Sequence, residues 1–308
     1  MGCSVPEASR PEVLLTPSDW LPRRDRHRSR LDALLGPYLQ QRGAGRANPV
    51  VDFLFTYYNR TPGQLRRWHP GFGVTLTGPP AQEYANLRGY GRTDSGVSAR
   101  PDHLTQRRGT IEYVAQLMAA TARRQAHLSC FGLHEWAMVY KADPEKLRHN
   151  VPLRLGHDDT NAVVESMPLR CTHFDAFRFF TDSAQPRNAI QLSRAEQVGV
   201  EQPGCVHAAM DLYRFAEKLL PLVDSDLLMD ALELAYAARE LDMRASPYDL
   251  RGYGYEPIPV ETSAGRAEYV RQQAAVARRS AGVRSSLLAR CEQLLAWRRT
   301  SGSLSTAN

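Results

Sequence analysis

The chain has 308 residues, of which 43% are hydrophobic and 23% charged, and its formal net charge is +6. These values are typical of globular proteins and exclude a disordered chain, a collagen-like fibre and a small disulfide scaffold. Only three of the 39 basic residues are lysines, so arginine carries the positive charge. Guanidinium groups suit phosphate, carboxylate or nucleic-acid partners, although an arginine-rich codon bias explains the same count.

The first part of the chain is predicted to be helical up to a region rich in glycine and proline. Residues 1–15 are expected to form a flexible N-terminus. A helix is expected over 16–41 with Ser18 as its cap, because leucines recur there at helical spacing. Its run RRDRHRSR is either a solvated face or a phosphate contact. A buried helix over 50–59, a short helix over 61–69 and a strand at Gly73–Thr77 follow.

The second part contains stronger helical periodicity. Helices are predicted over 108–124, 133–141, 205–220, 224–243 and 264–300. The aromatic segment 167–180 is expected to be a strand or an extended buried segment, and 301–308 a flexible tail. The predicted fold is mainly α with a minor β component, a compact multi-helix globular fold. Residues 16–300 are expected to form a single, mainly helical catalytic domain.

Five widely spaced cysteines without a CxxC pair argue against a disulfide framework and against a cysteine zinc site. This pattern favours the reducing cytoplasm as the location of the protein. The N-terminal sequence lacks the pattern of a signal peptide, and no apolar run reaches 18 residues. A membrane partner is therefore not expected.

Three segments place polar groups within apolar surroundings, where a charge is costly unless it is paired. The segment CFGLHEWAMVY holds His134 and Glu135. Next, CTHFDAFRFF holds His173 and Asp175, which share a face if the segment is extended. On one face of the predicted helix in EQPGCVHAAMDLYRFAEKL lie His207, Asp211 and Arg214. Taken alone, each histidine also fits a buried core residue whose ring nitrogens are hydrogen-bonded.

Two kinds of chemistry suit these groups if they converge. Imidazole and carboxylate ligands match zinc or non-haem iron, with six candidate ligands: His134, Glu135, His173, Asp175, His207 and Asp211. Acid–base catalysis without a metal needs a carboxylate that activates water and a second group that stabilises the leaving group. The catalytic candidates for that reaction are Glu135, Asp175, Asp211 and His134.

Substrate contacts are expected from arginines and aromatic residues near these segments and on two loops, 180–188 and 243–255, because loops over a scaffold often bind substrate. Trp136 offers an aromatic surface for a nucleobase. The substrate-binding candidates are Arg178, Arg187, Arg214, Arg244, Tyr248 and Trp136.

Five segments resemble, when taken together, a family of actinobacterial proteins commonly labelled 3-methyladenine DNA glycosylase. They are HPGFGV, CFGLHEWAMVY, HFDAFRFFT, QPGCVHAAMDLYRFAEKL and ELDMRASPYDL. The resemblance extends from about residue 15 to residue 280. It implies a DNA-repair hydrolase that binds DNA and excises alkylated purine, with no cofactor.

Three hypotheses follow for the function. The first is a DNA N-glycosylase that acts on alkylated bases by acid–base chemistry. The second is a metal-dependent oxygenase or hydrolase that uses iron or zinc on a small-molecule substrate. The third is a non-catalytic nucleic-acid-binding protein that relies on its arginines.

Overall fold

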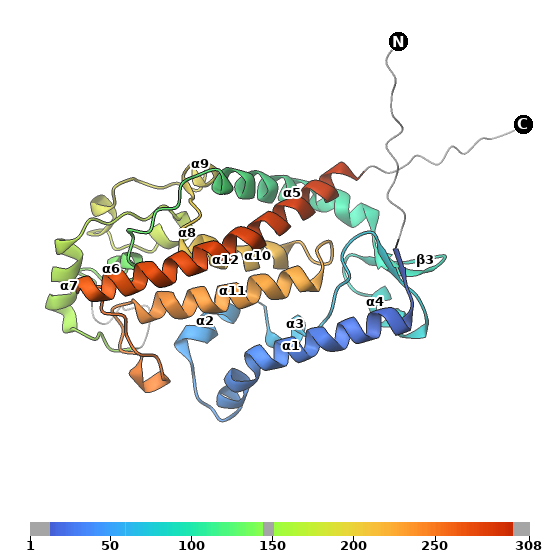
Figure 1. The fold of residues 1–308 in the computed structure, drawn as a ribbon, viewed down its shortest axis with the longest axis horizontal. Helices are drawn as coiled ribbons and strands as arrows, with labels where there is room; N and C mark the ends of the chain where they lie inside the picture. Colours follow the sequence, from blue (N-terminus) through green and yellow to red (C-terminus); the bar gives the residue numbers. More distant parts are fainter. Residues whose placement is uncertain (1–12, 59, 144–150, 298–308) are drawn as a thin grey trace, which may run out of the picture.

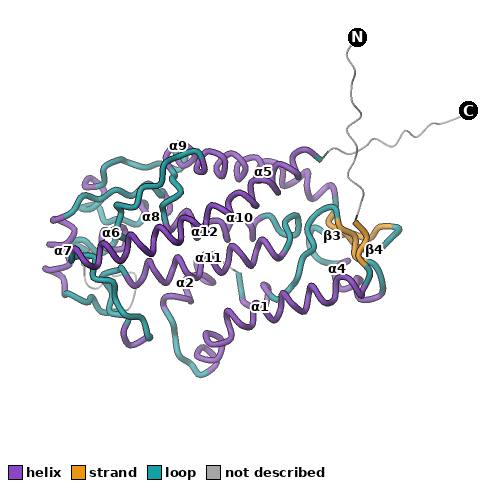
Figure 2. The backbone as a smooth tube through the Cα atoms, viewed as in Figure 1, coloured by secondary structure: helices purple, strands orange, loops and turns teal. Residues whose placement is uncertain are grey.

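The computed structural model describes residues 13–58, 60–143 and 151–297, and it confirms a mainly helical fold with a small β component. Long helices lie side by side, while the strands gather at one end of the molecule (Figures 1 and 2). The helix α6 lies at the opposite end (Figure 1). The predicted tail 301–308 and the last residues of the predicted helix 264–300 lie outside the described part.

All strands of the described chain lie within its first hundred residues, among helices, and the rest of the regular structure is helical. The longer helices are α1 (Pro17–Gly43), α2 (Pro49–Tyr57), α5 (Pro101–Ala122), α7 (Gly156–Ser166), α10 (Val206–Lys218), α11 (Ser225–Arg244) and α12 (Ser263–Ala296). Short helical segments are α3 (Pro62–Leu65), η1 (Pro79–Ala81), α4 (Gln82–Ala85), α6 (Leu133–Ala137), α8 (Phe174–Phe177), η3 (Gln185–Arg187), α9 (Gln197–Val200) and η4 (Arg251–Tyr253). The strands are β1 (Val13–Leu15), β2 (Val74–Leu76), β3 (Tyr90–Thr93) and β4 (Gly96–Ala99).

The core of the bundle is formed by α10 and α11, which pack against each other and against α12, while α5 packs on α12. Both α10 and α11 are buried on most sides, and their buried residues include charged ones, such as Asp211 and Asp242. Charged groups on a helix of this kind lie away from water, where they need partners. The two helices therefore carry the polar groups of the interior.

The helix starts follow from capping chemistry. Asn48 Oδ1 accepts hydrogen bonds from the amides of Val50 and Val51 at the start of α2. Asp224 and Thr262 cap α11 and α12 in the same way, which satisfies amides that have no partner within the helix. At the start of α1 the cap is Thr16, and the prediction of Ser18 was wrong. The Thr16 amide and hydroxyl both donate to Asp19, and the first helical residue is Pro17.

The four strands form a mixed sheet in the order β1-β2-β4-β3, with β1 parallel to β2 and the other pairs antiparallel. A second, smaller core packs beneath this sheet. Its centre is Trp20, which stacks on Trp68 with ring centroids 6.4 Å apart and donates to the carbonyl of Thr77. Since Trp20 comes from α1, this small core attaches the sheet to the bundle.

Several boundaries differ from the sequence predictions. Residues 13–15 form a strand where a flexible terminus was expected, because β2 supplies a distant pairing partner. The helix predicted over 108–124 begins at Pro101, a residue suited to the first helical turn. The helix predicted over 133–141 ends at Ala137, and α7 was not predicted.

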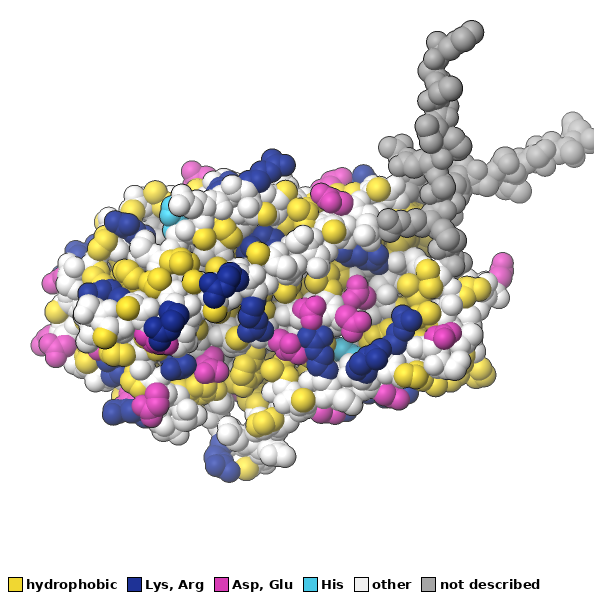
Figure 3. Space-filling view, viewed as in Figure 1, with side chains coloured by type: hydrophobic (Ala, Val, Ile, Leu, Met, Phe, Trp, Pro, Cys, Tyr) yellow, Lys and Arg dark blue, Asp and Glu magenta, His cyan; other side chains and the backbone are white. Residues whose placement is uncertain are grey.

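The basic run of α1 forms ion pairs with other elements. Arg30 binds Glu233 and Asp230 of α11, and Arg24 binds Glu83 of α4. On the face shown in Figure 3, Lys and Arg side chains alternate with Asp and Glu. This part of the arginine excess is therefore balanced by carboxylates. In the part of the chain that the structure describes, no helix is long and apolar enough to cross a membrane.

Close approach of the backbone requires glycine at the start of α12. A Cβ atom on the buried Gly265 would overlap the carbonyl group of Pro259, whereas Gly282 of the same helix is exposed with nothing within 4 Å. We expect Gly265→Ala to lower the free energy of unfolding by about 1–3 kcal/mol, as in other overpacked sites.

The matched control is Gly282→Ala, which we expect to stabilise the protein by up to about 1 kcal/mol because alanine is the better helix former. Urea denaturation of both variants measures the difference. Equal effects of the two substitutions would contradict the close approach at Gly265.

His69 joins the small sheet to the bundle. Its backbone amide donates to Ser225 Oγ at the start of α11, and its Nδ1 lies 2.9 Å from the Tyr90 hydroxyl in β3. Burial lowers the pKa of the His69 imidazole to about 3, and the positive charges of Arg67 and Arg60 add to this effect. The imidazole is therefore neutral in the folded protein at neutral pH.

Because His69 is neutral in the folded protein, we expect acid to weaken the contact between the small sheet and the bundle. An unfolded histidine takes up a proton near pH 6.5, whereas folded His69 does so only near pH 3. Its contribution to stability is present above pH 6.5 and is lost as the pH falls from 6.5 towards 3, by about 1.4 kcal/mol per pH unit.

We expect the stability difference between wild type and His69→Asn to shrink over this pH window in equilibrium denaturation. The exposed residue His127 offers a control, because His127→Asn should follow the wild-type curve. Parallel curves for wild type and His69→Asn would contradict the prediction.

Candidate functional site

Three helices bring four potential metal ligands together in the interior. His134 and Glu135 come from α6, His207 from α10 and Asp242 from α11, and one ligand atom of each lies within 4.8 Å of all the others. We call this group the four-residue centre. Gly132 (φ +70°) begins α6 in the left-handed region, where glycine is favoured. This turn directs the short helix into the bundle.

Asp242 lies close to both histidines of the four-residue centre. Its Oδ1 lies 2.7 Å from His134 Nε2, and its Oδ2 lies 3.9 Å from His207 Nε2. The two imidazole rings meet edge to face with centroids 4.4 Å apart. Burial opposes ionisation of Asp242, but His134, His207 and Arg239 outweigh it and hold the pKa of this carboxyl well below its usual range. Asp242 is therefore ionised.

The surroundings shift the pKa values of the two histidines in opposite directions. Burial lowers the pKa of His134, but the carboxylate of Asp242 outweighs this effect and the net shift is upward. The pKa of His207 falls well below its usual value, first because of burial and then because of neighbouring His134. His207 is thus a neutral imidazole, the form that binds metal ions.

Arg239 is a buried cation between the two carboxylates of the centre. Its Nη1 donates to Glu135 Oε1 at 3.0 Å and lies 3.1 Å from Asp242 Oδ2. The guanidinium also lies over the Phe53 ring, 4.0 Å from its centroid. One arginine against two carboxylates leaves a net negative charge whenever both histidines are neutral.

Two polar atoms of the centre have no hydrogen-bond partner within the described residues. These buried atoms are Glu135 Oε2 and His207 Nδ1. A buried polar atom without a partner costs about 1–3 kcal/mol. A cation bound between the helices would satisfy the carboxylate oxygen.

A second polar cluster lies directly beside the centre. The His173 ring stacks on His207 with centroids 5.3 Å apart. His173 Nε2 lies 3.3 Å from Asp211 Oδ2 and 3.7 Å from Glu201 Oε2. Burial opposes the charged form of His173, but Asp211 outweighs it and raises the pKa of the imidazole. Burial raises the pKa of Glu201.

Asp175 belongs to an arginine cluster, which Arg214 joins to Asp211. Arg214 Nη1 lies 2.6 Å from its Oδ2 and Arg178 Nε lies 3.2 Å from its Oδ1, while Arg194 also binds both oxygens. Burial of the carboxyl is outweighed by hydrogen bonds from Arg194 and Arg214, and the pKa of Asp175 is lowered to about 2. Asp175 is a structural anion in this arrangement, with its oxygens occupied by guanidinium groups.

The six candidate ligands therefore fall into three groups. His134, Glu135 and His207 meet at the centre, and His173 and Asp211 lie beside it. Asp175 lies apart from the centre, because the extended segment expected over 167–180 contains the short helix α8. His173 precedes this helix and Asp175 is within it, so the alternation of an extended chain does not apply.

Two of the substrate-binding candidates bind carbonyl groups of the chain itself. Arg187 Nη2 donates to the carbonyls of Val164 and Glu165, each at 3.3 Å. Arg244 Nε donates to the carbonyl of Glu256 at 2.9 Å. These bonds join loop segments to the helical body.

The aromatic candidates are buried. Trp136 Nε1 donates to the carbonyl of Ala245 at 2.8 Å, and Tyr248 lies in the core, where its backbone forms a β-bridge with Leu153. Arg178 and Arg214 bind Asp175, as described above. In this structure each of the six candidates contacts other residues of the chain, and their role in substrate binding stays a prediction.

Asp242, Arg239 and Glu201 were not among the residues predicted from the sequence. Arg239 and Asp242 are three residues apart in α11, so they share a face, and that face is buried. Two opposite charges on the apolar face of a long helix are a signal that could have identified them. Glu201 lies at the end of the short helix α9, where no periodic pattern marks it.

Comparisons of the chain with models of known families, with curated proteins and with solved structures found no match.

Proposed function

We propose that the protein is a metal-dependent enzyme whose four-residue centre binds zinc or iron. The observation that carries this proposal is the convergence of His134, Glu135, His207 and Asp242 within 4.8 Å. Zinc–ligand bonds are about 2.0–2.2 Å long for imidazole and carboxylate. Small side-chain movements would bring the four donors to that distance from a common ion.

The donor set favours catalysis over a purely structural role. Structural zinc sites are rich in cysteine thiolates, whereas catalytic zinc and non-haem iron sites combine histidines with a carboxylate. The four-residue centre holds two histidines and two carboxylates. A metal ion in such a site supplies a Lewis acid that activates a bound water or substrate oxygen.

Neighbouring residues have supporting roles in this proposal. Arg239 orients Glu135 and Asp242 through its hydrogen bonds, and His173 positions His207 by stacking on its ring. Partners of this kind fix the orientation of ligands and tune the affinity for the metal. The substrate class that we propose is a small molecule.

Elemental analysis of the purified protein, followed by chelation, tests the proposal. We expect about one zinc or iron ion per chain, and a content below about 0.2 would contradict the site. Hydrolysis of a panel of simple esters, amides and phosphodiesters, and oxygen consumption, should be measured before chelation, after it and after metal is restored. Turnover that is lost and then regained supports the enzyme.

The glycosylase activity implied by the resemblance stays a prediction. Its measurement is the release of free methylated base from alkylated DNA in the presence of a chelator. Release by the metal-free wild type would favour that reaction over the one proposed here. Salt-dependent DNA binding without turnover would instead favour the non-catalytic hypothesis.

A further inference from the structure

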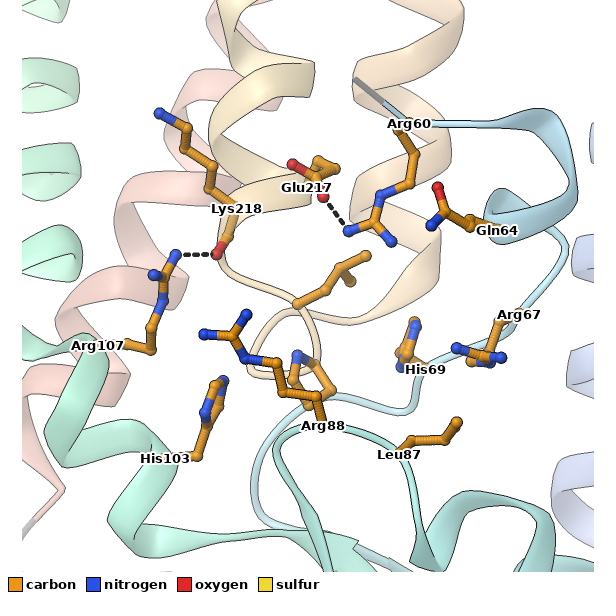
Figure 4. A pocket seen from close by; sticks show the side chains of 12 residues that line it. Arg60, Gln64, Arg67, His69, Leu87, Arg88, His103, Arg107, Glu217 and Lys218 are labelled. Carbon is orange, nitrogen blue, oxygen red and sulfur yellow. Dashed lines mark hydrogen bonds and ion pairs between the residues drawn. The ribbon is translucent and has the colours of Figure 1, made fainter. Parts of the chain in front are cut away.

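A second site, unrelated to the four-residue centre, is a cavity of about 370 Å³ between the loops of the small sheet and the end of α10. Arginines from four segments line it: Arg60, Arg67, Arg88 and Arg107. Figure 4 shows these side chains around a common space. We call it the arginine cavity.

Two of these arginines are held in place by the end of α10. Arg60 forms an ion pair with Glu217, and Arg107 donates a hydrogen bond to the carbonyl of Lys218. Both contacts are dashed in Figure 4, where the Lys218 ammonium points away from the arginines. Each guanidinium has five donors, so most of its N–H groups stay available to a ligand.

The other two arginines have no such anchor. Within the described ranges, neither Arg67 nor Arg88 has a hydrogen bond or ion pair from its guanidinium, and both are exposed. Figure 4 shows the Arg88 guanidinium directed between Arg107 and His103. Glu217 is the carboxylate of the cavity lining, so four guanidinium charges face one carboxylate.

Two buried histidines complete the wall. His103 Nε2 is a buried nitrogen without a hydrogen-bond partner among the described residues, and its side chain is 5% exposed. Burial lowers the pKa of His103, with Arg107 and Arg88 adding to the effect. His69 responds in the same way to Arg67 and Arg60. Burial is the main cause of both pKa shifts, and the positive charges of the neighbouring arginines add to it.

We propose that the arginine cavity binds the phosphate groups of a small phosphorylated molecule. Guanidinium groups bind phosphate oxygens bidentately. Four arginines from separate segments would contact several phosphoryl oxygens of one ligand from different sides. The concave shape favours a small ligand over a nucleic-acid backbone, because binding along a duplex uses an extended basic surface.

The arginine cavity and the four-residue centre are separate. His207 lies at the start of α10 and Lys218 at its end, which places them about 16 Å apart along the helix axis. The cavity shares no residue with the centre. Failure of one proposal therefore leaves the other intact.

Pyrophosphate and inorganic phosphate are suitable probes. We expect saturable binding of pyrophosphate to the full-length protein by isothermal titration calorimetry, at constant ionic strength, with half-saturation below about 1 mM. The melting temperature should rise with pyrophosphate concentration, as expected for a ligand that binds the folded state. The double variant Arg67→Gln/Arg88→Gln should weaken binding at least about tenfold, because it removes two charge-assisted contacts.

The matched control is Arg123→Gln. Arg123 is an exposed residue at the other end of α5 from Arg107, and its replacement should leave pyrophosphate binding unchanged. The proposal would be overturned by the absence of saturable binding, or by equal binding to the double variant. A DNA duplex that binds more tightly than pyrophosphate and loses affinity in the double variant would also overturn it, and would assign the cavity to nucleic acid.

Discussion

Replacing His207 with phenylalanine is expected to abolish metal binding without unfolding the protein. The phenylalanine ring retains the contacts with the rings of His134 and His173 but removes both nitrogens. We expect the metal content to fall from about one ion per chain to below about 0.2, and the affinity to fall by more than about 100-fold. Elemental analysis after dialysis and calorimetric titration of the metal-free protein measure both quantities.

The stability of this variant tests whether His207 is a metal ligand or a structural core histidine. The imidazole of His207 has an unpartnered buried nitrogen, so the metal-free variant should be within about 1 kcal/mol of the metal-free wild type. A chelator should lower the melting temperature of the wild type and leave that of the variant unchanged. Unchanged metal content in His207→Phe would contradict the assignment.

His27 provides the matched control for a structural histidine. It is buried in α1, and its Nε2 lies 2.8 Å from the carbonyl of Leu65. We expect His27→Asn to lower the free energy of unfolding by about 1–3 kcal/mol through the lost hydrogen bond, with full metal content. Together the two variants distinguish a loss of metal from a loss of stability.

Replacing Arg239 with methionine is expected to cost about 3–5 kcal/mol of stability, because it leaves buried carboxylates without their cation. Arg239 Nη1 is within 3.1 Å of both Glu135 and Asp242. Methionine resembles the aliphatic part of the arginine side chain but has no positive charge. Urea denaturation of the metal-free protein measures the loss. Addition of zinc should recover part of it, since the ion supplies the missing positive charge.

Two further variants control this experiment. The double variant Glu135→Gln/Arg239→Met removes one of the two carboxylate charges left without a cation, and it should be more stable than Arg239→Met alone. Arg108→Met breaks an exposed ion pair with Glu112 and should cost no more than about 0.5 kcal/mol. A similar cost for Arg108→Met and Arg239→Met would contradict the role of the buried pair.

Local periodicity accounts for the parts of the fold that were predicted correctly. The helices α2, α10 and α11 begin within two residues of their predicted starts, because apolar spacing and capping residues are properties of short windows. The pairing of β1 with β2 joins Val13 to Val74. Three-residue strands carry too little pattern to reveal a partner so distant in the chain.

Three of the four residues of the centre were predicted from the sequence, again because of a local pattern. His134, Glu135 and His207 stood out because each is a polar group within an apolar segment. Asp175 shared that property, yet three arginines bind it in the structure. Asp242 shares the buried face of α11 with Arg239, but its contact with His134 and His207 is visible only when α11 is placed against α6 and α10.

The sequence by itself determined the residue types available for chemistry, the helical class of the fold and the excess of arginine over lysine. Tertiary structure alone decided which carboxylate meets which imidazole and which arginines stay without an anion. The reason is physical: helical periodicity depends on neighbours a few residues apart, whereas burial and electrostatic pairing depend on side chains such as Glu135 and Arg239, which are 104 residues apart.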